Sequence, residues 1–553
     1  MSARSIRAEL ATDDNLGVGN VLTELVHRGV GLDEPTLTFD TVVDGHPAWQ
    51  ALTLRQLHER VAARAATLHA AGIGPRDPVA VFVGSAADQV LCYLALSRLG
   101  AIPALMNGRL DGETAARFIS RLGAAAVLAD AAHGSLLEGH DLGGPVVHDV
   151  AALGAGDPAT APDQFRHHSG DPAVITHSSG TTGLPKAVAH SHASLFASVR
   201  HRLTLPKAQA LSRFLGALPA AHAATVIAVN LALCNRSEML VISQQSADAV
   251  LEAIERWHPT GVLGFAATWS ELAAEDLSGR DLASVGLWWN TGDCAHEAHI
   301  RRLVALGSRE VAGRDGTRRV PGSQFIDGLG STEMGHSQFF ITHTPDTERY
   351  GRCIGRKHAF SDVVVFDEEG NTLGPGQVGQ LGVQAPTVAL GYWNDSVTTW
   401  RTRLSGYFLT GDLVSYDEDG YFYHVDRMVD SVDLGGGRRL FTAKAEEQLL
   451  AALPDILECT VVALPGDDGT AVAHVLLVPA PGADVTADRH AQVRAALDDH
   501  VAAAVRDVVA VAPDQLPLGP TGKVRKVLLR QRYLDGEILG EQVPHPSAGA
   551  AGA

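Results

Sequence analysis

Apolar and polar residues in the first half of the chain alternate between the spacing of helices and that of strands. Residues 54–71 and 86–99 carry apolar positions at helical spacing, and residues 78–83 form a short apolar run between them. Further short apolar runs predict strands at residues 124–130, 173–175, 216–218, 239–242 and 261–265. This alternation predicts an α/β fold in which sheets and helices pack in layers.

The pattern changes after residue 361. Between residues 362 and 423, short alternating strands are separated by tight turns, which predicts a β-rich subdomain. From residue 428 the sequence predicts a small, mobile α+β domain, with helices at 443–452, at 487–504 and from 524, and strands at 460–464 and 473–478. We therefore expect a large multi-subdomain N-terminal domain (1–427), a C-terminal domain (428–540) and a disordered tail (541–553).

Composition narrows the classes of function. A chain of 553 residues, 45% hydrophobic and 19% charged, is long enough for two or three cores. Its formal charge of -19 disfavours nucleic acid and anionic membrane surfaces as partners. The five cysteines are odd in number and widely spread, which is typical of reduced thiols. With neither a spanning apolar segment nor a signal-like region at residues 1–17, we expect a cytoplasmic protein without membrane insertion.

The strongest chemical signal is the segment T-H-S-S-G-T-T-G-L-P-K at residues 176–186, which directly follows a predicted strand. Glycines allow amides and hydroxyls to converge on phosphate oxygens, and the closing lysine adds a positive charge. Pro185 and Ala187 flank that lysine, so the segment differs from the ordinary P-loop, and a plain Gly/Ser turn is the alternative. The predicted phosphate-binding residues are Ser178, Ser179, Gly180, Thr181, Thr182, Gly183 and Lys186.

This loop resembles the signature of the AMP-forming adenylating superfamily, which contains acyl-CoA and aryl-CoA synthetases, peptide-synthetase adenylation domains and luciferases. Further matches occur in the order which that superfamily requires: L-P-A-A-H at 218–222, D-G-L-G-S-T-E at 327–333, G-Y-W at 391–393, T-G-D at 410–412, D-R at 426–427 and P-T-G-K at 520–523. The resemblance spans roughly residues 40–535.

The resemblance implies a role for each matched residue. Lys523 is the catalytic cation at the α-phosphate, while Thr332 bonds that phosphate and Glu333 binds Mg²⁺. His222 lies beside the acid, and the alternative for it is a buried structural histidine. For Thr332 and Glu333 the alternative is a helix N-terminus. The implied nucleoside-binding residues are Thr291, Gly292, Asp293, Asp327, Gly328, Leu329, Gly330 and Ser331 for adenine, and Asp412 and Arg427 for ribose.

The substrate is predicted less directly. Residues 226–233 with Phe265, Ala266 and Ala267 are candidates for an apolar acyl pocket, and residues 327–334 are similar to those of benzoate-type CoA ligases. This favours an aryl, cyclic or bulky apolar acid. The segment after His222 lacks the aspartate with which peptide-synthetase domains hold an α-ammonium group. The group Cys294, His296 and His299 lacks a closing ligand pair, so we do not predict a metal site there.

The hinge segment, residues 426–436, departs from the superfamily pattern. It keeps Arg427, Asp430 and Gly436, but Val429 replaces a polar residue and Asp433 replaces a lysine. The resemblance implies MgATP-dependent adenylation of a carboxylic acid followed by thioester formation with CoA. Because the hinge differs, transfer to another acceptor, such as a carrier protein, an amine or another nucleophile, stays open. A catalytically inactive nucleotide-binding protein is a further alternative, which is disfavoured because Lys186, Glu333, Asp412 and Lys523 occur together.

Overall fold

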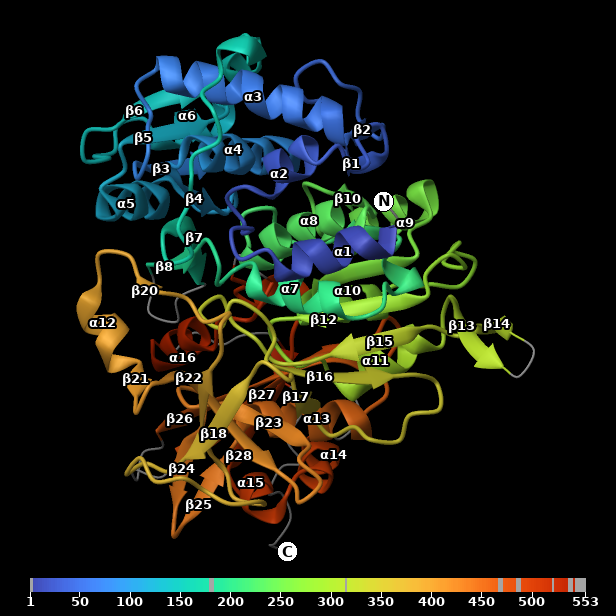
Figure 1. The fold of residues 1–553 in the computed structure, drawn as a ribbon. Coiled ribbons are helices and arrows are strands. Elements are labelled where there is room, and N and C mark those ends of the chain that lie inside the picture. The colour runs from blue at the N-terminus through green and yellow to red at the C-terminus, as the bar shows by residue number, and fades with distance from the viewer. Residues whose placement is uncertain are drawn as a thin grey trace, which may run out of the picture.

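The computed structural model describes residues 3–178, 184–313, 316–465, 471–483, 489–519, 522–535 and 541–542. A seven-stranded sheet forms the part of the molecule at the top of Figure 1. Its strands follow the order β20-β8-β7-β4-β3-β5-β6. They are β3 (Pro78–Phe82), β4 (Ile102–Met106), β5 (Ala126–Ala129), β6 (Val146–Asp149), β7 (Pro172–Ser178), β8 (Lys186–Ser191) and β20 (Gly391–Tyr392). The helices that accompany them are α3 (Leu54–Ala70), α4 (Ala86–Leu99), α5 (Gly112–Leu122) and α6 (Ala131–Leu137). Separate apolar clusters involve α3 and α4 in one case and α5 in the other, which gives the predicted layers.

A second, larger sheet runs through the middle of the molecule. Its α/β part has the order β16-β15-β12-β11-β9-β10-β1-β2. The strands are β1 (Pro35–Phe39), β2 (Ala51–Thr53), β9 (Arg213–Gly216), β10 (Glu238–Val241), β11 (Gly261–Phe265), β12 (Leu287–Thr291), β15 (Gln324–Asp327) and β16 (Phe339–His343). Helices of this part are α1 (Ala3–Thr12), α2 (Val21–His27), α7 (Ala197–Thr204), α8 (Ala223–Asn235), α9 (Ala247–Trp257), α10 (Ala266–Ala274) and α11 (Glu297–Val304).

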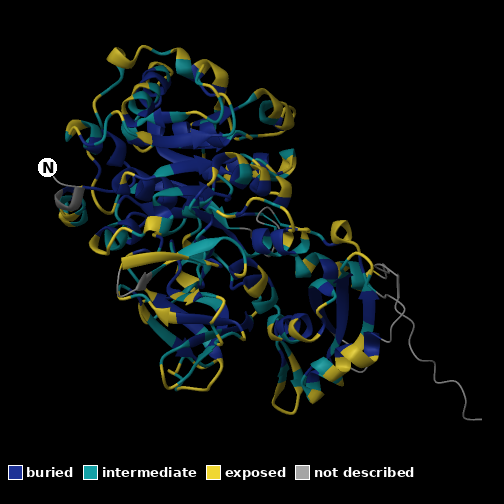
Figure 2. Cartoon of the chain, turned by 90° about the vertical axis from the view of Figure 1, so that its right-hand side faces the viewer, coloured by how far each residue is buried: buried dark blue, intermediate teal, exposed yellow. Residues whose placement is uncertain are grey.

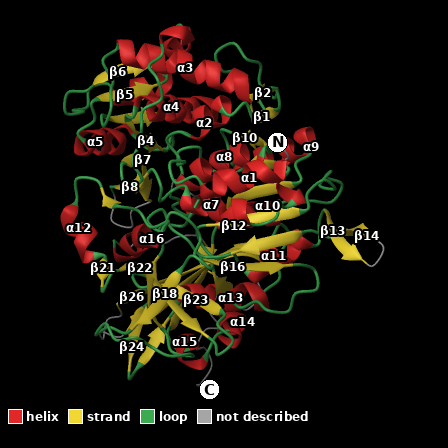
Figure 3. Ribbon diagram, in the orientation of Figure 1, coloured by secondary structure: helices red, strands yellow, loops and turns green. Residues whose placement is uncertain are grey.

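The same sheet continues into antiparallel strands, in the order β17-β23-β22-β19-β18. These are β17 (Cys353–Lys357), β18 (Asp362–Phe366), β19 (Gly379–Gln384), β22 (Tyr407–Tyr416) and β23 (Phe422–Arg427), with the short β21 (Arg403–Leu404) paired to β22 and α12 (Ser396–Arg401) nearby. The predicted β-rich subdomain is therefore present, but it extends the central sheet. A hairpin, β13 (Ser308–Gly313) with β14 (Gly316–Pro321), projects to the right in Figure 3, where strands are yellow.

The C-terminal part begins after β23. A hairpin of β24 (Val432–Gly435) and β25 (Arg438–Leu440) leads into a sheet with the order β26-β27-β28-β29. Its strands are β26 (Ile456–Pro465), β27 (Ala471–Pro479), β28 (Val505–Ala510) and β29 (Glu541–Gln542), and its helices are α13 (Thr442–Ala452), α14 (Arg489–Ala496), α15 (Asp499–Ala502) and α16 (Lys526–Leu534). Two apolar clusters flank this sheet, and Figure 2 shows its buried strands as a smaller body beside the larger one. The predicted α/β fold with a small α+β domain is confirmed.

Local chemistry explains where several elements begin and end. Helix α4 starts after Ser85, whose hydroxyl accepts the amide of Asp88, and ends at Gly100 with φ of 74°. The predicted helix 487–504 is wrong in one respect: α14 and α15 are separate helices, because Asp498 leaves the helical conformation at φ -56° and ψ 141°. The predicted strand 216–218 ends at Gly216, and Glu541 and Gln542 of the predicted tail pair with β28, while residues 543–553 lie outside the described part.

Two further observations bear on the chemistry. All five cysteines are buried and unpaired, so none forms a disulfide. No helix within the described ranges combines the length and the apolar character that crossing a bilayer requires.

Candidate active site

The hairpin of β7 and β8 holds both ends of the predicted phosphate loop. Ser178 ends β7 and Lys186 begins β8, and the two residues are partners in the strand register. The Lys186 ammonium lies 5.2 Å from the centre of the Tyr392 ring, and the Tyr392 hydroxyl donates to Oε1 of Glu333 at 3.0 Å. The fold thus brings Lys186 and Glu333 to the same tyrosine. The predicted phosphate ligands Ser179, Gly180, Thr181, Thr182 and Gly183 lie outside the described residues.

Two backbone segments predicted to enclose adenine lie against each other. The amide of Gly330 donates to the carbonyl of Gly292 at 2.7 Å, which fixes the segment 328–331 beside 291–293. A Cβ on Gly328 would lie 2.3 Å from the carbonyl oxygen of Phe339, and one on Gly330 would lie 2.9 Å from backbone atoms of Ser337. Both glycines are therefore required by close backbone approach. Leu329 is 2% exposed and packs in the apolar cluster of the β-rich strands.

Asp327 is buried and hydrogen-bonded beside the predicted adenine segment. Its carboxylate accepts hydrogen bonds from Nδ2 of Asn290 at 2.6 Å and from the Gly328 amide at 2.8 Å. Burial raises its pKa to about 7 against these hydrogen bonds. Asp327 therefore positions the loop that follows β12, and its contact with adenine stays a prediction.

Asp412 and Arg427 face each other across β22 and β23, where they are register partners. Nε of Arg427 lies 3.1 Å from Oδ1 of Asp412, and Nε2 of His424 lies 3.6 Å from the same oxygen. Burial favours the neutral acid, but the charge of Arg427 and the nearby His424 ring outweigh it and lower the Asp412 pKa. Asp412 is thus an ionised acceptor, 3% exposed, as expected of a group that binds ribose hydroxyls.

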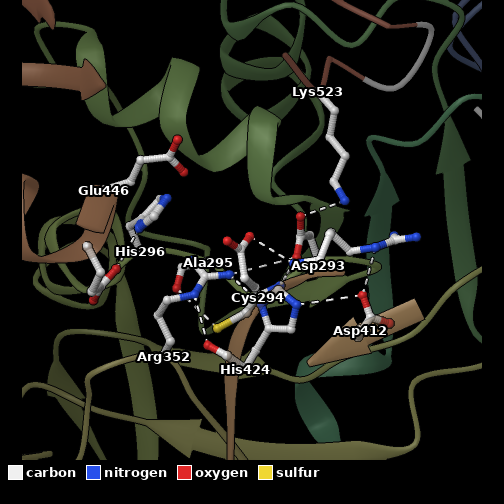
Figure 4. Close-up of polar contacts among 12 residues, drawn as sticks. Asp293, Cys294, Ala295, His296, Arg352, Asp412, His424, Glu446 and Lys523 are labelled. Carbon is white, nitrogen blue, oxygen red and sulfur yellow. Dashed lines mark hydrogen bonds and ion pairs between the residues drawn. The ribbon is translucent and has the colours of Figure 1, made fainter. Parts of the chain in front are cut away.

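Lys523 enters the site from the C-terminal domain, as Figure 4 shows. Its ammonium lies 2.5 Å from Oδ2 of Asp293, the residue after Gly292. Although burial opposes ionisation, the charges of Lys523, His424 and Arg352 hold the pKa of Asp293 well below its usual range. The predicted catalytic lysine and the predicted adenine-side loop are therefore in direct contact.

Several residues of this site were missed by sequence reasoning. Arg352, which precedes β17 with φ of 60°, donates to Nδ1 of His424 at 2.6 Å and lies 3.9 Å from Asp293. A cavity between the two domains is lined by Asp293, Arg352, His424, Arg427, Lys523 and Lys526, among others. Arg352 and His424 come from elements far apart in the sequence and belong to none of the motifs, so no local spacing marks them.

Histidines of the discounted Cys294–His299 group bind the C-terminal domain. Nδ1 of His296 lies 2.5 Å from Oε2 of Glu447, and Nε2 of His299 lies 3.1 Å from the carbonyl of Leu457. On the same face, Ser270 donates to Glu458 at 2.5 Å. These contacts hold the domain that carries Lys523 against α10 and α11.

An apolar pocket lies on the other side of the Thr291–Gly292 segment and encloses about 680 Å³, including its open mouth. Its apolar lining is Phe214, Ile227, Ala228, Leu231, Leu263 and Trp289, and its polar lining includes His222, Thr291, Ser331, His336 and Ser337. Phe265 packs edge-on against His222 instead, and Ala266 and Ala267 line the cavity between the domains, so part of the predicted lining is corrected.

His222 caps the start of α8. Its Nδ1 accepts the Ala224 amide at 3.1 Å, so the ring proton of the neutral form lies on Nε2. Burial lowers its pKa to about 4, which keeps the ring neutral near pH 7. The Nε2–H of His222 is thus an uncharged hydrogen-bond donor at the end of the pocket that faces the predicted nucleotide site, which we call the nucleotide end.

Comparison with known proteins agrees with this geometry. A family model described as AMP-binding enzyme matches residues 33–393. The chain is 43% identical over 553 residues to a 3-aminoavenalumate diazotase of Streptomyces sp, covering 96% of this chain and 98% of that relative. It is 27% identical over 484 residues to a feruloyl-CoA synthase of Amycolatopsis sp, covering 87% and 94%.

Among solved structures, the anthranilate CoA ligase AuaEII in complex with anthranoyl-AMP shares the fold, with a TM-score of 0.81 at 20% identity over 97% of this chain and 100% of that one. The likeness covers both domains. The family match, the full-length relatives and the assembled nucleotide site agree that this chain belongs to the AMP-forming adenylating superfamily and is an AMP-forming adenylating enzyme.

Proposed function

We propose that this enzyme is an ATP-dependent diazotase that converts an amino-substituted aromatic acid into its diazonium form. The observation that carries the proposal is the 43% identity to a 3-aminoavenalumate diazotase over nearly the full length of both chains. Diazotisation of a primary aromatic amine needs an activated nitrosyl group, and nitrite is its simplest source. Nitrite is a small planar oxyanion like a carboxylate, so an adenylating site can activate it.

In the first step a nitrite oxygen attacks the α-phosphorus of ATP, the bond to the β-phosphate oxygen breaks, and pyrophosphate leaves. Negative charge grows on the α-phosphate oxygens as this bond forms. Lys523 and Lys186 supply positive charge from opposite sides of the nucleotide, while Asp412 binds the ribose hydroxyls. Because these groups are held by strands and by the Asp293 contact, they stabilise that charge without reorganising.

Magnesium is the metal that the nucleotide implies, and Glu333 fits it. Oε1 of Glu333 accepts the Tyr392 hydroxyl at 3.0 Å, which leaves Oε2 for a cation. Within the described residues no group of three or more His, Cys, Asp or Glu side chains assembles around one point. Mg²⁺ is commonly held by one or two carboxylates together with phosphate oxygens and water. Glu333 would hold this ion, which would supply charge neutralisation for the phosphates.

In the second step the amine nitrogen attacks the nitrosyl nitrogen, the bond from nitrogen to the AMP oxygen breaks, AMP leaves, and the amine nitrogen releases one proton to solvent. The resulting N-nitrosamine takes up a proton and loses water to give the diazonium ion, so no oxidant or reductant is needed. The pocket suits this acceptor. An aromatic amine is uncharged near pH 7, and among the described residues those that line the pocket include no lysine, arginine, aspartate or glutamate.

Transfer of an aryl acyl group to CoA is the second candidate. It is supported by the feruloyl-CoA synthase, which shares 27% identity, and by a nucleotide site that serves either oxyanion. In this reading the activated carboxylate occupies the position of nitrite, and the C-terminal domain rotates to admit the thiol. The hinge argues against this second candidate, because Asp433 in β24 is an exposed negative charge where the superfamily pattern has a lysine.

The test separates the two candidates by what ATP cleavage requires. Enzyme and MgATP are incubated near pH 8, where spontaneous nitrosation is slow, with 3-aminoavenalumate and a panel of aminobenzoates and aminocinnamates, each with and without nitrite and with and without CoA. We expect sustained release of AMP and pyrophosphate, together with a diazonium ion that couples to 2-naphthol, only when nitrite and amine are both present, and at most a small release of pyrophosphate with nitrite alone. With ¹⁵N-nitrite the label enters the terminal nitrogen. An acyl-CoA product formed without nitrite overturns the proposal in favour of the ligase.

A further inference from the structure

An arginine without an acidic partner lies beside the apolar pocket. Arg202 is in the last turn of α7, and its guanidinium carbon lies 5.9 Å from the centre of the Trp289 ring, which lines the pocket. Its Nε is buried and has no hydrogen-bond partner. Among the described residues, no aspartate or glutamate forms an ion pair with it, whereas Arg427, which is also partly buried, pairs with Asp412.

The groups around Arg202 are basic or aromatic. Arg7 donates to the backbone carbonyl of Arg202 at 3.0 Å. The rings of His201 and Phe360 are 5.1 Å apart, and those of His336 and His358 are 5.5 Å apart. The charge of Arg202 contributes to the lowered pKa of His336 and of His358, after burial as the main cause. This neighbourhood therefore raises the cost of the arginine charge instead of neutralising it.

A partly buried cation with no counterion is unfavourable, and the local compensation seen among the described residues is weak: the Trp289 ring face and the carbonyl end of α7, which contributes roughly 0.3–1 kcal/mol. Such a site is suited to an anion delivered by a ligand. His336, which lines the pocket, and Trp289 separate Arg202 from the space where an aromatic substrate lies. A substrate carboxylate that extends beyond the Trp289 ring would contact the guanidinium of Arg202.

We propose that Arg202 binds the free carboxylate of an amino-substituted aromatic acid whose amine faces His222 at the nucleotide end of the pocket. This inference rests on the proposed function, because it requires that the carboxylate is not the group that is adenylated. The arrangement fits the length of the pocket. Trp289 and Thr291 are two residues apart on one face of β12, so they are separated by roughly 7 Å, about the span of one aromatic ring.

The adenylation of a simple aryl acid requires the opposite orientation of the substrate. There the carboxylate binds at the nucleotide end near Lys523, and an apolar ring tail occupies the pocket next to Trp289. Removal of the Arg202 charge then changes acid binding little. The dependence of acid binding on Arg202 therefore reports which end of the substrate is activated.

The experiment uses Arg202→Gln, which removes the charge, and Arg202→Lys, which keeps it without the planar fork. KM and kcat are measured in the nitrite-dependent reaction for an aminocinnamate and for its carboxamide. The matched control is Arg256→Gln, an exposed arginine stacked 4.2 Å from the centre of the Trp49 ring. For Arg202→Gln we expect a roughly 10- to 100-fold higher KM for the acid with little change in kcat or in the carboxamide reaction, and partial recovery in Arg202→Lys.

An equal loss for acid and carboxamide, or a fall in kcat with unchanged KM, overturns the assignment. Calorimetric titration of the acid into enzyme preloaded with AMP needs no nitrite and separates the two proposals. If the wild-type enzyme forms no diazonium ion, the diazotase proposal fails, and the titration alone decides Arg202. Weaker acid binding in Arg202→Gln then upholds the carboxylate site, whereas equal affinity in both proteins refutes it.

Discussion

Replacing Lys523 by alanine tests the adenylation site at its most exposed point. The lysine side chain is 45% exposed and its ion pair with Asp293 is open to solvent, so the pair contributes roughly 0–1 kcal/mol to the free energy of unfolding. Its catalytic contribution is larger, because the charge acts on the developing negative charge of the α-phosphate. Removing one such preorganised group typically costs about 100- to 1,000-fold in kcat. We therefore expect a loss of activity in a protein of nearly normal stability.

The assay measures pyrophosphate release at saturating MgATP, together with ATP affinity by calorimetry. Lys523→Ala should lower kcat about 100- to 1,000-fold and change the ATP dissociation constant little, because the charge acts mainly in the transition state. Lys444→Ala is the matched control: Lys444 lies in the same domain, is 52% exposed and pairs with Asp498 at 2.9 Å. If Lys523→Ala keeps activity within about threefold of wild type, or if Lys444→Ala loses as much, the catalytic assignment is refuted.

Three further predictions concern the nucleotide site and the contact between domains. Glu333→Gln should raise the Mg²⁺ concentration required for half-maximal pyrophosphate release at least tenfold, since a carboxamide is a weaker ligand for a hard cation; an unchanged requirement contradicts the metal role. Asp412→Asn should raise the KM for ATP about 10- to 100-fold, and because the Asp412 pKa lies below its ordinary 3.8, the wild-type contribution should persist above about pH 4 and be lost on further acidification. At His296 burial lowers the pKa, but the hydrogen bond and charge of Glu447 raise it above 6.5, so its stabilisation of the domain contact is complete below pH 6.5 and lost as pH rises through the raised pKa. Amide hydrogen exchange of α13 should therefore accelerate with pH beyond its chemical rate in wild type and lose this extra dependence in Glu447→Gln.

Sequence patterns predict the nucleotide site because its chemistry is local. A strand followed by glycines, hydroxyls and a lysine, or a Gly-flanked aspartate, occupies one short segment, so the residue types and their order are visible along the chain. The structure places Lys186, Glu333, Asp412, Arg427 and Lys523 around one region, although the phosphate-loop residues 179–183 lie outside the described part. The same patterns also predicted the layers of the fold.

Tertiary contacts account for what the sequence could not predict. Arg352 and His424 are separated by 72 positions, yet they form one hydrogen bond beside Asp293. Asp327 belongs to a motif that indicates a base contact, and its carboxylate accepts a hydrogen bond from the buried side-chain amide of Asn290. Apolar residues after β11 indicated an acyl pocket, whereas the turn into α10 directs Ala266 and Ala267 toward the other domain. In each case the deciding partner is distant in sequence.

Most residues that line the acceptor pocket lie outside the superfamily motifs, although His222 and Ser331 belong to them. The motifs mainly describe the nucleotide side, which is common to the reactions of this superfamily, while much of the pocket is formed by α8, β12 and the segment after Gly330. An aryl acid activated through its only carboxylate needs one cation, at the α-phosphate, and leaves Arg202 buried without a counterion. A substrate that presents an amine to the neutral His222 and a carboxylate to Arg202 satisfies both ends of the pocket at once. The arginine beside Trp289 is therefore easier to explain if the activated oxyanion is a separate small molecule than if it is the acid itself.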